Sequence, residues 1–457
     1  WTGVPLNVIL SDDTKVLDEV VVVAYGTARK SDLTGATASL RPDANDASKT
    51  ASFNNLLQGK VAGLNVTSSM AAPGAASSVT IRGANSLRGD NQPLYVIDNV
   101  PQSSTGEFAE SAMGGGDFQI AQDPLSALNP ADIEDITVLK DASATAIYGS
   151  RGANGVIIIT TKKGKKADKV KVDFSANLTA QFYTSQSLMN VCNSSEYATA
   201  MAQAALNDGL DPVLYASNYG LNLNAESGTP ITVWNPSLGQ YVNYTVNGLY
   251  DGYINSKKTM RYSDTDWLDE ISRTGFSQNY DLSLSHANDK HSTMFSLGYK
   301  KNNGILKYTD FENISARMNS SYNVNKYVTV GENFTVTYSS QADCAPMENA
   351  LKMAPIVPVY EEDGTTFSGP VGGMSDRQNP LRELYHNKDN HLNYWRLFGN
   401  GYVDIKPFDG FVFRSNFGLD FYNSFINAMT HTFHSDIVNN DIAITRLSNK
   451  NVVNWIW

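Results

Sequence analysis

The chain has 457 residues, of which 41% are apolar and 18% are charged, and its formal net charge at pH 7 is -11. This acidic balance argues against a nucleic-acid partner, because nucleic acids are bound by basic surfaces. The sequence contains no run of about 18 or more apolar residues, which excludes a transmembrane helix. If the chain meets a bilayer, it must do so as a closed barrel of strands, which pairs every backbone polar group inside lipid.

The region before residue 53 contains one apolar block in a largely polar stretch of chain. Its four consecutive valines, Val20 to Val23, favour an extended backbone because β-branched side chains are stiff at χ1. A short apolar run of this kind is most often a buried core strand. When polar chain such as Thr27 to Asp32 follows it, the strand is also suited to addition at the edge of a partner's sheet.

Residues 53 to 164 have the pattern of a compact α+β domain, with short apolar runs separated by glycine-containing turns. The segment from Ser103 to Asp123 lacks periodicity and is expected to be a loop. The expected regular elements are a short helix through Leu56 and Leu57, a second helix opened by Asp141, and strands within residues 64–67, 77–87, 92–101, 133–139 and 156–161.

Several of these segments resemble one known family. Residues 132–164, DIEDITVLKDASATAIYGSRGANGVIIITTKKG, resemble the plug of an outer-membrane TonB-dependent transporter, as does the earlier segment NNLLQGKVAGLNVTSS. The stretch LDEVVVVAYGTARKSDLTGA, which includes the valines, is similar to the TonB box and linker of the SusC/RagA-like subgroup. The family commonly has glycine where this chain has Asn99, and asparagine tolerates the left-handed backbone that a tight turn requires.

After Lys169 the sequence alternates between apolar and polar residues, which indicates strands with two unlike faces. Between Phe411 and Phe421, large apolar side chains alternate with polar ones that include Arg414 and Asp420. Such charges are inexpensive on a lumen face, whereas the lipid midplane costs an arginine about 2–4 kcal/mol. The candidate strands are 169–183, one beginning at 276, one through 295–299, and then 314–322, 327–339, 395–405, 411–422 and a last one from about Val452.

The joins between these strands alternate in length. They are short at 286–291, 323–326 and 406–409, and long at 184–275, 302–312, 340–393 and 423–450. Transmembrane barrels show this alternation, because their periplasmic turns are short and their outer loops are longer. Glu332 is an exception to the face pattern, since it shares a face with Val330 and Phe334. A bulge, a position near a membrane interface or a wrong register would each account for it.

The resemblance extends over nearly the whole chain and implies an α+β plug domain inside an antiparallel transmembrane β-barrel. The full barrel would have about 22 strands around a plugged lumen, of which this chain would supply about eight. We expect the chain to be a piece of a longer protein, because an open wall leaves unpaired edges in the bilayer. The expected divisions are the end of a preceding domain at 1–17, the TonB box and linker at 18–52, the plug at 53–166, and the first part of the barrel, with long extracellular loops, at 167–457.

The resemblance further implies TonB-dependent import of a large nutrient, an oligosaccharide or a peptide, across the bacterial outer membrane. The implied partners are TonB of the inner-membrane energy complex, a SusD-like surface lipoprotein that forms a lid, and the lipid bilayer. The implied TonB-binding residues are Asp18, Glu19, Val20, Val21, Val22, Val23, Ala24, Tyr25 and Gly26. The candidate substrate-facing plug loop contributes Ser103, Ser104, Thr105, Glu107, Glu110, Asp117 and Gln119. The alternatives are an outer-membrane binding receptor or adhesin without active transport, and a soluble β-rich glycan-binding protein.

No motif in the sequence predicts an enzyme, a cofactor or a metal site. The G-x-S-x-G and H-E-x-x-H motifs and the glycine-rich phosphate-binding motifs are missing. Glu361 to Asp363 is expected to be a solvated turn rather than a catalytic carboxylate pair. His431 and His434 have no acidic third ligand nearby and are expected to be an incidental pair.

The sequence does not decide the pairing of the two cysteines or the role of the aromatic residues in the long joins. Cys192 and Cys344 are far apart and are expected to be unpaired thiols. Aromatic residues in the long joins could stack on sugar rings, but aromatic residues also pack cores and form interfacial girdles, and we expect the latter roles. The aromatic residues in question are Tyr215, Tyr219, Trp234 and Tyr241.

Overall fold

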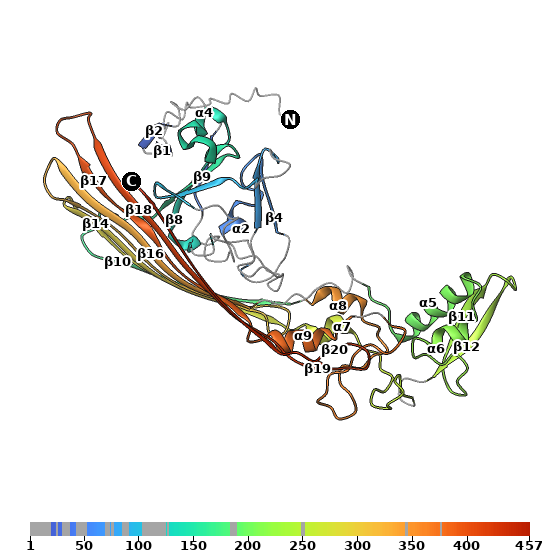
Figure 1. Cartoon of the computed structure of the whole chain (residues 1–457). Helices are drawn as coiled ribbons and strands as arrows, with labels where there is room; N and C mark the ends of the chain where they lie inside the picture. Colours follow the sequence, from blue (N-terminus) through green and yellow to red (C-terminus); the bar gives the residue numbers. More distant parts are fainter. Residues whose placement is uncertain are drawn as a thin grey trace, which may run out of the picture.

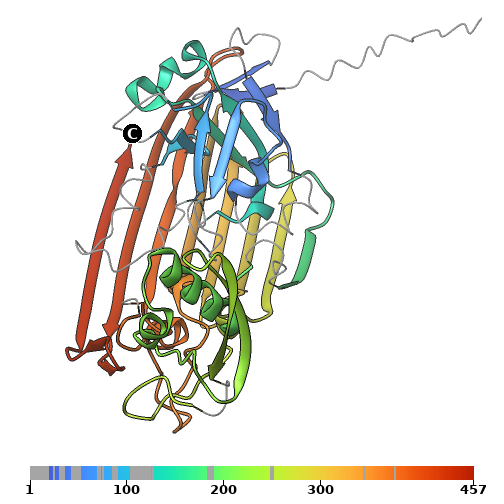
Figure 2. The same ribbon diagram turned by 90° about the vertical axis from the view of Figure 1, so that its right-hand side faces the viewer.

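The computed structural model describes residues 20–23, 26–29, 37–42, 53–68, 74, 77–84, 91–102, 125, 128–182, 190–247, 252–342, 346–374 and 377–457. Most of them belong to three parts: a small α+β unit, a curved wall of eight long strands, and a helical unit beyond one end of the wall (Figure 1). We call these parts the plug, the wall and the outer unit. The plug lies against one face of the wall (Figure 2), which we call the inner face.

The plug is built on a five-stranded sheet with the order β3-β8-β9-β6-β7. Its strands are β3 (Thr37–Leu40), β6 (Leu94–Ile97), β7 (Val100–Pro101), β8 (Ile133–Leu139) and β9 (Val156–Thr161). Strand β9 is central and almost wholly apolar, and its Ile157 and Ile159 are fully buried. The hairpin of β4 (Leu64–Ser68) and β5 (Ser77–Ile81) and the helices α2 (Phe53–Leu57), α4 (Ala142–Thr145), η3 (Pro130–Asp132) and η4 (Ala146–Gly152) complete the unit.

The plug elements confirm the local predictions from the sequence. The turn between β6 and β7 holds Asp98 at φ 45° and Asn99 at φ 69°, in the left-handed region. Aspartate and asparagine visit this region more easily than other residues that carry a side chain, so the turn forms without glycine at Asn99. The domain boundaries stay a prediction, although β3, from the expected linker, pairs with β8.

The wall is one sheet in which each strand pairs antiparallel with the next along the chain. Its strands are β10 (Lys171–Gln181), β13 (Gly275–Ala287), β14 (His291–Asn303), β15 (Asp310–Asn323), β16 (Val328–Ala342), β17 (His391–Ile405), β18 (Phe413–Thr430) and β21 (Ile444–Ile456). The eight strands confirm the architecture expected from the sequence. Short and long joins also alternate, although the join 304–309, which was expected to be long, is no longer than 406–412.

The two faces of the wall differ as the alternation predicts. On β18, Asp420 and Ser424 are buried on the inner face, whereas Phe417 and Phe425 are exposed on the outer face. Glu332 lies on the outer face, where it is the register partner of Ser320 and accepts a hydrogen bond from the Ser320 hydroxyl. The ladders on both sides of β16 are continuous, which rules out a bulge at Glu332 and confirms the predicted register.

Some strand ends predicted from the sequence were wrong. The last strand begins at Ile444 rather than near Val452, and β18 continues to Thr430 rather than ending at Tyr422. The segment from Thr445 to Asn451 carries mostly polar side chains, so its sequence reads as a loop. Its backbone nevertheless pairs with β18. Backbone hydrogen bonds between strands form wherever a neighbouring strand is available, even when the side chains do not alternate between apolar and polar.

The outer unit consists of two of the long joins, which fold together rather than remaining extended loops. The first join contains α5 (Ser194–Asn207), α6 (Pro212–Ser217), the hairpin of β11 (Gly228–Asn235) and β12 (Gln240–Asn247), and α7 (Trp267–Ile271). The second contains α8 (Met347–Lys352) and α9 (Pro380–Asn387). Both contribute to one hydrophobic core that includes Leu223, Met260, Val357 and Leu384. A third long join carries the short strands β19 (Phe433–His434) and β20 (Asn439–Asn440).

Local sequence signals fix the start of the longest helix in the outer unit. The side chain of Asn193 accepts a hydrogen bond from the Glu196 backbone N–H, and the Glu196 carboxylate accepts one from the Asn193 N–H. This reciprocal capping box satisfies two backbone donors that the first turn of α5 leaves free. None of the helices in the described ranges is both long enough and apolar enough to cross a membrane.

Candidate functional site

The contact between the plug and the inner face of the wall is largely polar. Buried polar side chains project from the middle strands of the wall, and three of them, Arg317, Asn319 and Arg396, hydrogen-bond to plug residues. These wall residues are Ser315, Arg317, Asn319, Asn333, Thr335, Thr337, Arg396, Asn400 and Asp420. We call these wall residues, with the groups of the plug and the wall that bond to them, the polar seam.

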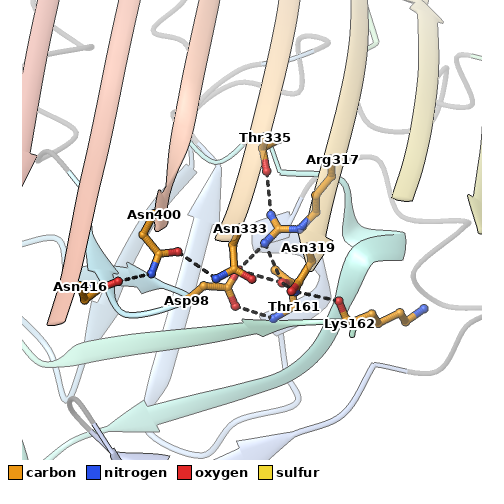
Figure 3. A network of polar contacts seen from close by, with 9 residues as sticks. All are labelled: Asp98, Thr161, Lys162, Arg317, Asn319, Asn333, Thr335, Asn400 and Asn416. Carbon is orange, nitrogen blue, oxygen red and sulfur yellow. Dashed lines mark hydrogen bonds and ion pairs between the residues drawn. The ribbon is translucent and has the colours of Figure 1, made fainter. Parts of the chain in front are cut away.

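The centre of the polar seam is an ion pair between Arg317 of β15 and Asp98 of the plug (Figure 3). The two side chains are only 3% and 7% exposed, so water screens the pair little. Thr161 of β9 joins them, since its backbone N–H and hydroxyl donate to the Asp98 carboxylate over 3.0 and 2.8 Å. Arg317 also donates to the Thr161 and Thr335 hydroxyls, at 2.6 and 2.8 Å. A single guanidinium therefore ties the β6–β7 turn and the end of β9 to the wall.

Asparagine side chains extend the seam across neighbouring strands (Figure 3). Asn319 donates to the Lys162 carbonyl of the plug at 3.1 Å. Asn333, Asn400 and Asn416 form a chain of amides across β16, β17 and β18, with donor–acceptor distances of 2.9 and 2.5 Å. These are neutral hydrogen bonds, each of which contributes only about 0.5–1.5 kcal/mol because water can replace it.

A second arginine holds the far end of the β6–β7 hairpin. Arg396 of β17 donates two bonds of 2.8 Å to the Asp420 carboxylate and a third to the side-chain oxygen of Gln102. The Gln102 backbone carbonyl also accepts from Arg151 at 2.7 Å. Because Gln102 directly precedes the expected substrate-facing segment, the hairpin is fixed to the wall just before that segment begins.

Nearer the first wall strands, the plug and the wall line a partly open cavity of about 280 Å³. Asn129 of the plug donates to Asp281 of β13 at 2.6 Å beside this cavity. Glycine at 298 permits this approach, since a Cβ there would lie 2.6 Å from the Asn129 amide nitrogen. Burial raises the pKa of the Asp132 carboxyl, which lines the same cavity, while nearby Arg317 opposes the rise.

Apolar contact between the plug and the wall is confined to few positions. Phe398 of β17 is buried in the core of the plug. At Gly418 of β18, a Cβ would lie only 3.0 and 3.1 Å from the two Cγ atoms of Val100, so β7 packs directly on the wall backbone. The plug is thus held mainly by hydrogen bonds and ion pairs that water can replace, with a small apolar contribution.

The structure bears only partly on the candidate TonB segment. Val20–Val23 forms strand β1, which pairs antiparallel with β2 (Gly26–Arg29) in a two-stranded sheet. Asp18, Glu19, Ala24 and Tyr25 lie outside the described residues. The candidate loop residues Ser103, Ser104, Thr105, Glu107, Glu110, Asp117 and Gln119 also lie outside them.

The structure also places the acidic turn at Glu361 to Asp363 and one of the two cysteines. Asp363 accepts a hydrogen bond from the Thr366 hydroxyl at 2.6 Å and bonds of 2.8 Å from the backbone N–H groups of Thr366 and Thr365, and these bonds lower its pKa to about 2. Glu362 pairs with Arg261, so the acidic turn is tied into the outer unit. No three histidine, cysteine, aspartate or glutamate side chains in the described chain gather as metal ligands. Cys192 is an exposed free thiol, and Cys344 falls outside the described ranges.

The expectation that no acidic group lies near His431 and His434 was wrong, since Asp441 lies 3.5 Å from the His434 ring. His431 has an aromatic neighbour, His386 of α9, at a ring distance of 5.0 Å. Burial, followed by the charges of His431 and Arg382, lowers the pKa of His386 to about 4. This value is below the roughly 6.5 of an unfolded histidine. The stability that neutral His386 contributes is therefore complete above pH 6.5 and is lost as the pH falls toward 4.

We expect the outer unit to lose roughly 1–2 kcal/mol of stability between pH 6.5 and 4 through His386, a figure reduced because the side chain is only half-buried. His386→Phe should remove this loss, as measured by hydrogen exchange of α9 at both pH values. His434→Gln is the matched control, because His434 is 74% exposed. An unchanged pH dependence in His386→Phe would show that another group is responsible.

Comparisons with known proteins agree with this geometry. The TonB-dependent Receptor Plug Domain model matches residues 29–156. The TonB-dependent receptor SusC of Bacteroides thetaiotaomicron is 33% identical over 88% of this chain and 36% of its own length. The TonB-dependent receptor P26 of Formosa agariphila is 32% identical over 94% of this chain and 37% of its own length. The chain thus spans little more than a third of these relatives.

A solved structure of the RagAB peptide importer in the 'open-open' state has the same fold, with a TM-score of 0.67 at 23% identity. The match covers 91% of this chain and 43% of that one. The relatives are outer-membrane β-barrel proteins, and the plug and the eight antiparallel strands described above correspond to part of that architecture. The chain is therefore a SusC/RagA-like part of a TonB-dependent outer-membrane receptor, comprising the plug and about eight strands of the barrel.

Proposed function

We propose that the full-length protein imports a large nutrient, an oligosaccharide or a peptide, across the outer membrane in a TonB-dependent manner, and catalyses no reaction itself. The polar seam is the observation that carries this proposal. A plug that must move to open a path has to separate from the wall without exposing a large apolar surface. Hydrogen bonds can be exchanged for bonds to water at a small net cost. A receptor or adhesin that never opens has no need of such an interface.

The energy for this movement would enter through residues 18–26, which we propose as the TonB-binding segment. In the described part of the chain, β1 has β2 as its one strand neighbour. Its other edge can accept a strand from a partner, whose backbone would complete the ladder. A pull on this strand would act on the plug, because β3 follows it in the chain and pairs with β8.

We further propose that a SusD-like lipoprotein covers the outer end of the barrel. The structural neighbour RagAB is described as a peptide importer, and by analogy substrate would bind between the lid, the outer loops next to the barrel and the top of the plug. The plug loop proposed to meet it contains Ser103, Ser104, Thr105, Glu107, Glu110, Asp117 and Gln119.

The test of TonB dependence is a substitution within β1 of the full-length protein. Val22→Pro removes a backbone donor and should reduce energised uptake at least tenfold. The affinity of the extracted receptor for the same labelled oligosaccharide or peptide should stay unchanged. Val22→Ile, which keeps strand propensity, is the matched control. Uptake that survives both Val22→Pro and deletion of residues 18–26 would show that import does not depend on TonB. Binding of the ligand without energised uptake by the unchanged protein would favour a receptor or adhesin without active transport.

A further inference from the structure

The hairpin of β11 and β12 carries an exposed aromatic pair that the proposed import does not use. Figure 1 shows this hairpin in the part of the outer unit farthest from the wall. Trp234 and Tyr241 are register partners on its solvent face, with ring centroids 5.1 Å apart and planes inclined by 69°. Their exposed fractions are 41% and 70%, so neither ring is a core residue. The distance from the wall also separates them from any girdle at the lipid interface.

The hairpin is held rigidly behind this pair. Ile231 and Val233 alternate with the exposed residues and are buried in the core of the outer unit. Gln203 of α5 donates to the Trp234 carbonyl at 2.8 Å and accepts from the Trp234 N–H at 2.9 Å. At Trp234, the edge of β11 that does not face β12 is therefore hydrogen-bonded to α5, which fixes the backbone that carries the indole. A backbone that is already fixed loses little entropy when a ligand binds to the ring that it carries.

The chemistry of this face is neutral and rich in hydrogen-bonding groups. No aspartate, glutamate, lysine, arginine or histidine occurs from Ser227 to Tyr250, in a chain where 18% of residues are charged. Next to the rings, the Thr232 hydroxyl donates to the Asn243 side-chain oxygen at 2.8 Å. This bond orients the Asn243 amide so that its nitrogen faces away from Thr232 and can donate to a ligand.

We propose that this face is a binding site for neutral oligosaccharides, separate from the transport path through the barrel. A sugar ring has an apolar C–H face, which the exposed ring surfaces of Trp234 and Tyr241 can cover. Its hydroxyl rim can bond to Asn243 and Thr232. A charged peptide or an anionic polymer would find no ion partner on the hairpin. The small extent of the apolar area and its polar flank also fit a sugar better than a protein interface.

The test measures sugar binding by the detergent-extracted full-length receptor without TonB, so the result does not depend on import. The probes are neutral hexasaccharides of glucose, xylose, mannose and galactose, with hexagalacturonate as the anionic counterpart. We expect at least one neutral sugar to bind, with about three- to tenfold weaker affinity in Trp234→Ala and in Tyr241→Ala. Tyr241→Phe, which keeps the ring, should retain most of the affinity.

Leu238→Ala is the matched control, because Leu238 is an apolar residue of the same hairpin, 61% exposed, without an aromatic ring. It should leave the affinity unchanged. Binding of no neutral sugar, or binding that Trp234→Ala and Tyr241→Ala leave intact, would overturn the proposal. Tighter binding of hexagalacturonate than of every neutral sugar would also overturn it. If the alanine variants instead lose only a co-purifying protein, the face is a protein interface.

Discussion

Replacing Arg317 with methionine is expected to weaken the seating of the plug by about 3–5 kcal/mol. The substitution removes the guanidinium but leaves the buried Asp98 carboxylate in place, with Thr161 as its remaining partner. A buried charge without its counter-ion loses the interaction that offset its desolvation. Two plug elements should loosen together, because Asp98 lies in the β6–β7 turn and Thr161 ends β9.

The loosening can be measured on the full-length protein by hydrogen exchange of β6 and β9, whose amides should exchange faster. Entry of a large antibiotic that the intact outer membrane excludes should also increase. Arg414→Met is the matched control. Arg414 also pairs with an aspartate, at 2.5 and 2.6 Å, but its partner, Asp404, belongs to the wall and not to the plug. Arg414 is 39% exposed, so its loss should leave plug exchange unchanged.

A double variant separates the charge effect from general damage to the wall. Combining Arg317→Met with Asp98→Asn removes both charges and should recover much of the lost protection. If the single and double variants exchange equally fast, the arginine acts by filling space rather than by pairing. Protection of β6 and β9 that persists in Arg317→Met would contradict the assignment of the ion pair as the main tie.

The sequence predicted those features that depend on neighbouring residues in the chain. Strand alternation placed Arg414 and Asp420 on the inner face, and the tolerance of Asn99 for left-handed backbone predicted the β6–β7 turn. It did not reveal the partner of Arg317, because Asp98 is 219 residues away along the chain. The sequence does show that Arg317 is a charged residue on the polar face of an alternating membrane strand.

The sequence did not predict the outer unit or the close contacts at Gly298 and Gly418, because both depend on residues that are distant along the chain. The core that joins Leu223 to Val357 forms between two separate joins, and no local period reports such a contact. Gly298 and Gly418 permit close contact only once the plug lies against the wall, so their role depends on tertiary structure. The aromatic pair of β11 and β12 is a further case, since exposure, and not sequence, distinguishes a binding surface from a core.

The second large effect expected is the loss of import when the plug is cross-linked to the wall. Val100→Cys with Gly418→Cys would join β7 to β18 through a disulfide, which requires Cβ atoms about 3.5–4.5 Å apart. The two positions are neighbours, because the Val100 Cγ atoms, one bond beyond its Cβ, lie 3.0 and 3.1 Å from a Cβ at position 418, and the Cγ2 methyl group of the Ile456 side chain, at 2.8 Å, would have to move. Cys192 and Cys344 would be replaced by serine to avoid other disulfides.

Oxidation of this double variant should reduce TonB-dependent uptake at least tenfold, and a reductant should restore it, while substrate affinity stays constant in both states. The reversal controls for misfolding, and each single cysteine variant controls for the oxidant. If the oxidised protein imports at the normal rate, the β6–β7 hairpin stays on the wall during transport, and the path must open elsewhere along the plug. Asn129 and Asp281 would then be the place to cross-link next, because there the plug donates directly to a second region of the wall, over 2.6 Å. A block at Gly418 would instead show that the hairpin held by Arg317 and Arg396 has to leave the wall.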